Sequence, residues 1–215
     1  MIDTSPPAIQ RSQVWYWFIT YLARVVCSAY FFVRAFGRRH VPVSGGALLV
    51  ANHQSFLDPV LVAAVLNRPI YFLARSTLFV GPLGTLIRSL HAIPIDREGV
   101  DRVAFRQAVD VLKAGHLLLI FPEGTRSHDG GSLGTFRGGF GVLARRSGVP
   151  IVPVTIHESG RAWPRKRWVP LPWPITVLFS LPQAADSEAE TSENVRAAVR
   201  RMLETTPHGF AQQGT

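Results

Sequence analysis

The sequence predicts an α/β protein in which helices flank a mostly parallel central sheet. Two observations indicate this fold. Short apolar runs alternate with segments whose apolar residues have helical spacing, and histidine, acidic and arginine side chains follow the ends of the runs. Strands joined through helices pair in parallel, because each right-handed crossover returns the chain to the same end of the sheet. The loops after the strands then share one edge, which is where α/β sheets bind ligands.

The predicted strands are short apolar runs bounded by glycine, proline or polar residues, a pattern typical of buried strands. They cover residues 47–51, 69–74, 91–95, 117–121, 150–156 and 175–181. Helices are predicted where start and stop signals or three- and four-residue apolar spacing mark a segment. They cover residues 59–66, 77–90 (with a break at Gly81, Pro82 and Gly84), 103–113, the segment after Gly139 to about 146, and 194–203. The acidic stretch 188–193 precedes the last helix, where the helix dipole favours negative charge.

The N-terminal residues 14–36 are almost entirely apolar and aromatic, and only Arg24 and Arg34 interrupt them. Roughly 20 such residues can cross a bilayer, but an arginine near the middle is costly there. We therefore expect a helix, or a bent pair of helices, that lies in one leaflet, with a helix buried against the domain as the alternative. A cleaved signal peptide is not expected, because the apolar stretch is too long and no clear cleavage site follows it.

The composition indicates an anionic partner. Lys and Arg number 23 against 14 Asp and Glu, a net charge of +9, and 47% of the residues are hydrophobic. Such a surface attracts nucleic acid, anionic lipid or a phosphorylated substrate, and the apolar content favours the membrane surface. The chain has one cysteine, Cys27, so no internal disulfide is possible and a reducing compartment is expected.

Residues 157–174 interleave tryptophans with cations among four prolines. This composition suits a phospholipid interface. A grip on single-stranded nucleic acid and a solvated basic loop are the alternatives.

The stretch NHQSFLD at residues 52–58 joins the first predicted strand to the helix that starts at Pro59. An imidazole can take a proton from a hydroxyl near neutral pH, and a carboxylate on its other nitrogen fixes the tautomer. The five-residue offset from His53 to Asp58 lets the two side chains meet. On spacing alone, the plainer interpretation stays open, with Asp58 as the helix N-cap and His53 as a polar loop residue.

Three arginines, Arg97, Arg126 and Arg137, are candidate phosphate ligands. Guanidinium groups offer paired donors to phosphate oxygens and keep their charge. Gly124 lets a backbone N–H approach an anion closely, and Glu123 can orient Arg126 or accept a hydrogen bond from a substrate hydroxyl. Solvated loop arginines and an ordinary turn are the alternatives.

Several kinds of chemistry lack their sequence signatures. The chain contains no P-loop and no dinucleotide-binding glycine pattern. It contains no paired Cys/His cluster for a metal and no nucleophile elbow of a serine hydrolase. The sequence therefore predicts neither a bound cofactor nor a catalytic metal.

Residues 52–58 resemble the first motif, N-H-x-x-x-x-D, of the glycerophospholipid acyltransferases, and most of all the 1-acyl-sn-glycerol-3-phosphate acyltransferases. The stretch IDR at 95–97 resembles their second motif, FPEGTRS at 121–127 matches the third, and VPIVPV at 149–154 resembles the fourth. The resemblance implies an acyltransferase domain over residues 41–206. Together with the composition, it implies a flexible start at 1–13, a membrane-associated helical segment at 14–40 and a disordered tail at 207–215.

The resemblance implies acyl transfer from a thioester to the sn-2 hydroxyl of lysophosphatidic acid, which gives phosphatidic acid in phospholipid biosynthesis. The implied donor is acyl-CoA or acyl-carrier protein, and no other cofactor is implied. Another lysophospholipid, glycerol-3-phosphate or a polar lipid is the alternative acceptor. A non-catalytic basic protein that binds a membrane surface or nucleic acid is the alternative class. The implied location is a membrane, the inner or plasma membrane in a bacterium, with the active site on the cytoplasmic side and without nucleic acid as a partner.

The resemblance also implies residue roles. His53 is the implied general base and Asp58 its orienting partner. The implied phosphate site contains Arg97, Glu123, Gly124, Thr125, Arg126 and Arg137. Pro153, in the fourth motif, is implied in donor binding or in shaping the site. Arg75, in ARSTL at 74–78, stands where many members have a lysine thought to hold the oxyanion, and Arg137 likewise replaces a usual lysine.

Overall fold

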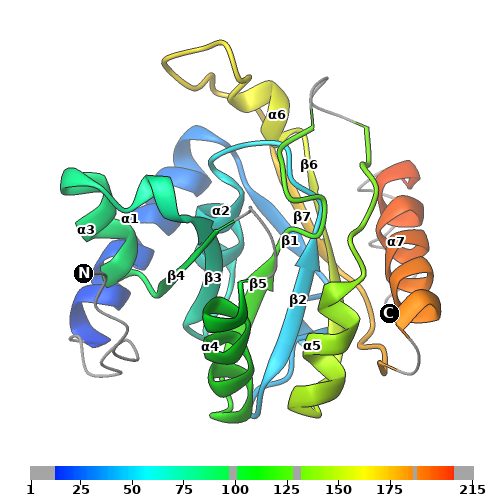
Figure 1. Ribbon diagram of the computed structural model, residues 1–215. Coiled ribbons are helices and arrows are strands. Elements are labelled where there is room, and N and C mark those ends of the chain that lie inside the picture. The colour runs from blue at the N-terminus through cyan, green and yellow to red at the C-terminus, as the bar shows by residue number, and fades with distance from the viewer. Residues whose placement is uncertain (1–12, 97–100, 128–131, 186–187, 206–215) are drawn as a thin grey trace.

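A seven-stranded sheet forms the centre of the computed structural model, which describes residues 13–96, 101–127, 132–185 and 188–205 (Figure 1). The strands lie in the order β1-β7-β6-β2-β5-β3-β4. They are β1 (Arg34–Phe36), β2 (Ala47–Ala51), β3 (Ile70–Arg75), β4 (Ala92–Ile95), β5 (Leu117–Ile120), β6 (Ile151–His157) and β7 (Thr176–Phe179). The helices are α1 (Gln13–Tyr30), α2 (Asp58–Val65), α3 (Gly81–Ser89), α4 (Arg102–Lys113), α5 (Gly139–Ser147), α6 (Ser159–Ala162) and α7 (Glu188–Glu204), with 3₁₀ turns η1 (Arg38–His40) and η2 (Ser76–Leu78).

The prediction of a mostly parallel sheet is confirmed. Strand β2 pairs in parallel with β5 and β6, and β3 pairs in parallel with β4 and β5. Strand β7 is antiparallel to β6, because the chain between them turns back at the same edge and makes no helical crossover. The loops after β2, β5 and β6 therefore open side by side at one end of the sheet, as expected.

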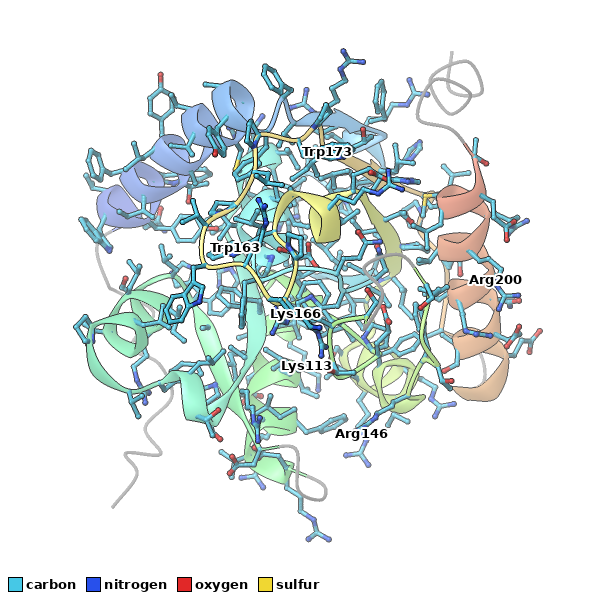
Figure 2. All side chains as sticks on the ribbon, turned by 90° about the horizontal axis from the view of Figure 1, so that it is seen from above. Lys113, Arg146, Trp163, Lys166, Trp173 and Arg200 are labelled. Carbon is cyan, nitrogen blue, oxygen red and sulfur yellow. The ribbon has the colours of Figure 1, made fainter. Side chains whose placement is uncertain are left out.

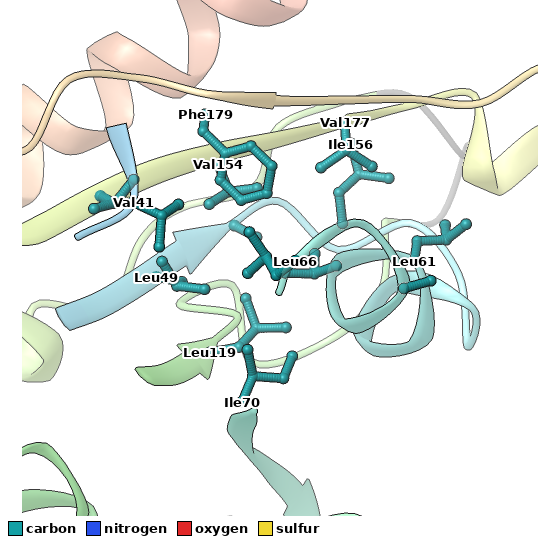
Figure 3. Packing of buried hydrophobic residues seen from close by; sticks show 14 of the residues in the cluster. Val41, Leu49, Leu61, Leu66, Ile70, Leu119, Val154, Ile156, Val177 and Phe179 are labelled. Carbon is teal, nitrogen blue, oxygen red and sulfur yellow. The ribbon is translucent and has the colours of Figure 1, made fainter. Parts of the chain in front are cut away.

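The sheet is buried on both faces, as parallel sheets usually are. Neighbouring residues of β2 point to opposite faces: Leu49 belongs to one cluster together with Leu61 of α2 (Figure 3), whereas Leu48 belongs to a second cluster together with Phe140 of α5. Helices α1 and α2 thus cover one face, and α4, α5 and α7 cover the other. This burial explains why the strands are continuous apolar runs in the sequence.

The N-terminal segment differs from its prediction. Helix α1 ends at Tyr30, so the expected helical segment at 14–40 is wrong beyond that residue. Arg34–Phe36 form the edge strand β1, which pairs in parallel with β7. A strand of three residues is too short to show a periodicity of its own, so the sequence merges it with the apolar helix before it. The expected tail at 207–215 lies outside the described residues, as does the expected flexible start except for Gln13.

Helix α1 is attached to the domain through its polar side chains. Arg24 donates from Nε to the carbonyl of Ala64 and from Nη2 to the carbonyl of Leu66, both at 2.7 Å. These carbonyls lie at the C-terminal end of α2, where a cation is favourable. Tyr16 is buried, and its hydroxyl accepts from the backbone N–H of Ile70 at 3.0 Å. The arginine that interrupts the apolar run therefore anchors the helix.

The outer face of α1 is apolar and exposed. Phe18 is 60% exposed and Tyr21 is 67% exposed, and Leu22 and Val25 lie open beside them. No helix in the described part of the chain combines the length and the apolar character that a membrane crossing requires. One face of α1 packs on the domain, as the alternative interpretation held, and the other is free to meet an apolar surface.

Two other helices begin at residues other than predicted: α3 starts later and α7 starts earlier. Helix α3 starts at Gly81 and contains Pro82, so the predicted break there is the start of the helix. Proline fits the first turn because its missing N–H is not needed there. The acidic stretch 188–193 forms the first turns of α7 instead of preceding it.

Candidate active site at the strand ends

His53 and Asp58 meet across the turn between β2 and α2. Nδ1 of His53 lies 2.8 Å from Oδ2 of Asp58; the carboxylate is fully buried, whereas the imidazole side chain is 15% exposed. A carboxylate only accepts hydrogen bonds, so Nδ1 carries the proton and Nε2 is the basic nitrogen. The ring stacks on Phe121 with 4.1 Å between centroids, which holds its plane. This is the arrangement of a histidine base that is oriented by a carboxylate.

Asp58 occupies the first position of α2, and Leu57 is the N-cap, so the alternative N-cap role of Asp58 is wrong. The side chain points back into the loop instead. Its Oδ2 also accepts from the backbone N–H groups of Gln54 at 2.7 Å and Ser55 at 2.9 Å. Three hydrogen bonds on one oxygen hold the carboxylate beside the imidazole and shape the 52–58 loop.

Asn52 attaches this loop to strand β6 and Gln54 attaches it to helix α6, and neither was among the predicted site residues. Asn52 donates to the carbonyl of Ile156 at 3.0 Å and accepts from its N–H at 2.8 Å. The Gln54 side-chain oxygen accepts from Ser159 and from the N–H of Gly160, both at 3.4 Å. Both side chains are buried. Their place beside His53 in the first motif was the signal that could have identified them.

Glu123 joins the two motif loops. Its Oε1 accepts from the backbone N–H of His53 and its Oε2 from that of Gly134, both at 2.9 Å. Burial raises the pKa of the Glu123 carboxyl, and the hydrogen bonds from the two backbone groups act in the opposite direction. Both oxygens are thus engaged by protein, and Glu123 supports the two loops; its role at the phosphate stays a prediction.

We expect Glu123→Ala to destabilise the protein by about 2 kcal/mol or more, because two part-buried N–H groups lose their acceptor and each costs about 1–3 kcal/mol. Glu123→Gln keeps one acceptor oxygen and should lose less. Urea unfolding of the three proteins measures the order. If Glu123→Ala instead unfolds like the wild type and raises only the KM of the acyl acceptor, the carboxylate contacts substrate.

Arg126 and Arg165 bring two guanidinium groups together beside the third motif. Cζ of Arg126 lies 3.7 Å from the centroid of the Phe56 ring. Arg165 donates to Oγ1 of Thr125 at 3.1 Å and to the carbonyl oxygen of Arg126. Burial, and next the charge of Arg165, lower the pKa of Arg126. Two neighbouring cations at the edge that holds His53 form a site suited to an anion such as phosphate.

Arg165 comes from the 163–175 loop, which connects α6 to β7 and covers this end of the sheet. Figure 2 shows Trp163 and Lys166 of the loop over the centre of the molecule when it is seen from above. Trp163 packs edge-on against Phe56 with centroids 6.3 Å apart. The sequence predicted a basic, tryptophan-rich loop, but the contact with the third motif is long-range and carries no local signal.

Gly124 has φ +67°, a conformation that favours glycine. A Cβ at this position would lie 3.4 Å from Cζ of Arg137, so the guanidinium of Arg137 is beside the backbone of the third motif. Gly124 and Arg126 lie on the loop of the third motif, and Arg137, from the segment that follows this loop, lies beside Gly124.

The other predicted site residues take different places. Arg75 is exposed at the end of β3, which is separated from β2 by β5. Pro153 is buried inside β6, opposite Val50, and its carbonyl accepts from the N–H of Ser180 at 2.9 Å. Arg97 lies outside the described residues. The roles proposed for these three residues stay predictions, as does the catalytic role of His53.

A comparison with models of known protein families finds a match that covers more than half of this chain. A family model described as Acyltransferase matches residues 32–157, a range that contains all four motif stretches. The chain belongs to the acyltransferase family. In this acyltransferase, the matched range includes β1, which the sequence had assigned to the N-terminal membrane segment, and ends at His157, the last residue of β6.

Individual relatives agree with the family. The chain is 31% identical over 205 residues to the 1-acyl-sn-glycerol-3-phosphate acyltransferase of Pseudomonas aeruginosa, covering 91% of this chain and 77% of that protein. It is 35% identical over 123 residues to LPAT1 of Arabidopsis thaliana, a chloroplastic 1-acyl-sn-glycerol-3-phosphate acyltransferase, but spans only 33% of its length. The crystal structure of the 1-acyl-sn-glycerophosphate (LPA) acyltransferase PlsC from Thermotoga maritima superimposes with a TM-score of 0.76 at 27% identity, over 92% of this chain and 84% of that one.

Proposed function

We propose that this acyltransferase transfers a fatty acyl group from a thioester to the sn-2 hydroxyl of 1-acyl-sn-glycerol-3-phosphate and forms phosphatidic acid. The observation that carries this proposal is the His53–Asp58 pair, 2.8 Å apart, on the same sheet edge as Arg126 and Arg165. A base for a hydroxyl and a site for a phosphate thus lie together. The relatives named above are acyltransferases of this acceptor, which supports the same choice for this chain.

The reaction needs one base and no covalent enzyme intermediate. Nε2 of His53 takes the proton of the acceptor hydroxyl as its oxygen attacks the thioester carbonyl. The C–O bond forms, the C–S bond breaks, and the leaving sulfur takes the proton back from the imidazolium. Asp58 stabilises that imidazolium through Nδ1. Because a thiolate is a good leaving group, the absence of a nucleophile elbow from the sequence is consistent with this route.

The phosphate of the acceptor binds to the guanidinium groups of Arg126 and Arg165, with Arg137 close by. Paired N–H donors match phosphate oxygens in geometry and charge. Arg126 is held over the Phe56 ring, and Thr125 accepts a hydrogen bond from Arg165. Holding the phosphate places the hydroxyl of the glycerol backbone in reach of His53, which is how positioning accelerates acyl transfer.

The protein meets the membrane through the outer face of α1 and the tip of the 163–175 loop. Trp168 is 96% exposed in that loop, and Tyr30 of α1 donates from its hydroxyl to the carbonyl of Pro170 at 3.0 Å. This bond joins the end of α1 to the loop that covers the site. Exposed tryptophan, tyrosine and phenylalanine side chains suit the lipid interface, where they give access to a lysolipid without a membrane crossing.

An acceptor panel tests the proposed function. Thiol release from one acyl-CoA is measured with lysophosphatidic acid, lysophosphatidylcholine or glycerol-3-phosphate as the acceptor. We expect acceptor-dependent release, with kcat/KM for lysophosphatidic acid at least about tenfold above that for lysophosphatidylcholine, because choline masks the phosphate from the arginines. Equal rates with all acceptors, or release that needs no acceptor, would refute the assignment.

A further inference from the structure

A groove lies between helices α4 and α5, and His53 is not among the residues that line it. Its volume is about 860 Å³, and its floor is apolar: Phe105 and Val109 come from α4, and Val142 from α5. None of these three is part of the fully buried core, which α4 reaches with Ala104 and Ala108 instead. All three side chains are half-buried, and Phe105 and Val109 pack against the core on their inner side, so their outer sides and Val142 form the apolar floor of one trough.

The rim of the groove is basic. Arg102, Arg106 and Lys113 line it from α4 and Arg146 from α5, and all four side chains are exposed. No acidic residue lines it among the described residues; Asp110 of α4 lies outside it. The rim extends from Arg102 to Lys113, eleven positions of one helix, which is about 16 Å at 1.5 Å per residue.

The groove faces away from the surface that α1 presents. Helix α1 contributes to the core on one face of the sheet, whereas α4 and α5 contribute to the core on the other. Figure 2 shows Arg146 on the side of the molecule remote from α1. A bilayer that contacts the outer face of α1 therefore does not reach this groove. Its occupant must come from the aqueous side.

The groove ends next to the reaction site. Gly139 lines it at the first residue of α5, two positions after Arg137, whose guanidinium lies beside Gly124. One end of a partner bound along the groove therefore lies at the sheet edge that carries His53. A long flexible arm on that partner can extend from there into the site.

We propose that this groove docks a small acidic acyl-carrier protein, which presents the acyl thioester to the site. An amphipathic helix lays its apolar face on Phe105, Val109 and Val142, a recurring mode of helix recognition. Its carboxylates pair with the four rim cations, a complementarity that steers encounter and selects the partner. The inference rests on the proposed function and names its donor: the acyl group leaves the carrier's sulfur for the acceptor oxygen, and the carrier departs as a free thiol.

A double charge reversal, Arg106→Glu with Arg146→Glu, tests the proposal in the full-length protein. Initial rates are measured with lysophosphatidic acid and either acyl-carrier protein thioester or acyl-CoA of the same chain length. We expect the KM for the carrier thioester to rise about tenfold or more, and that for acyl-CoA to change by less than about twofold, because only the carrier needs the groove. The matched control, Arg200→Glu with Arg201→Glu, makes the same charge change on exposed positions of α7 and should behave as wild type with both donors.

Three outcomes would overturn the proposal: a wild type that does not use the carrier thioester, unchanged KM values in the double variant, or an equal rise for both donors. Loss of binding to anionic vesicles, together with an equal rise, would assign the groove to lipid. Thermal melting verifies the fold, and if the reversal unfolds the protein, Arg106→Gln with Arg146→Gln replaces it. The wild-type rate with acyl-CoA and lysophosphatidic acid tests the proposed function independently of the groove. If the wild type uses acyl-CoA but not the carrier thioester, the docking proposal fails and the proposed function stands.

Discussion

His53→Ala should lower kcat by at least about 100-fold, because a positioned general base contributes about 100- to 10,000-fold. The imidazole is the group that accepts the hydroxyl proton, and without it Asp58 keeps the two hydrogen bonds from the backbone N–H groups of Gln54 and Ser55 and stays in place. The ring is 15% exposed and packs mainly on Phe121, so its loss should leave a cooperative thermal transition. Steady-state rates with saturating donor and acceptor, alongside melting curves, measure both effects.

His40→Ala is the matched control for this substitution. His40 bonds through Nδ1 to the carbonyl of Phe179 at 2.9 Å and is not part of the loops that surround His53. It should keep a normal kcat although it also loses one ring hydrogen bond. A purified His53→Ala protein that turns over at nearly the wild-type rate would remove His53 from the mechanism.

Arg126→Ala should raise the KM of the acceptor about 10- to 100-fold, because a hydrogen bond to a charged group contributes about 1.5–3 kcal/mol and 1.4 kcal/mol is tenfold. The KM of the acyl donor should change much less, since the thioester carries no charge at this position. The guanidinium already lies over the Phe56 ring, so little side-chain entropy is lost when phosphate binds. Initial rates at varied acceptor and at varied donor separate the two constants.

Arg165→Ala should shift the acceptor KM in the same direction by a smaller factor, because Arg165 is more exposed than Arg126. Lys166→Ala, the exposed neighbour in the same loop, is the control for a general loss of positive charge and should leave both constants near wild type. Equal changes in acceptor and donor KM after Arg126→Ala would show that this arginine does not read the phosphate.

Much of the fold follows from local pattern. Buried parallel strands are apolar on both faces, so 47–51 and 117–121 stand out as runs, and the structure places β2 and β5 within one residue of these bounds. The apolar pattern did not separate two neighbouring elements that have the same composition, helix α1 and strand β1. Arg34–Phe36 continues an apolar helix in sequence, yet pairs with β7, a strand that begins at Thr176. No periodicity within three residues can report a partner so far along the chain.

The sequence by itself was enough to predict the family and the parallel sheet, because motif residues and hydrophobic runs are local features. The five-residue offset allowed His53 to meet Asp58 but left the N-cap alternative open, and the 2.8 Å contact in the structure decided between them. Only the tertiary structure decided that Glu123 joins two loops through the N–H groups of His53 and Gly134, and that Arg165 lies beside Arg126. These contacts depend on which loops the sheet order brings to one edge. Backbone donors and loop neighbours of that kind leave no mark in residue type or spacing, since any residue supplies an N–H and most loops contain a cation.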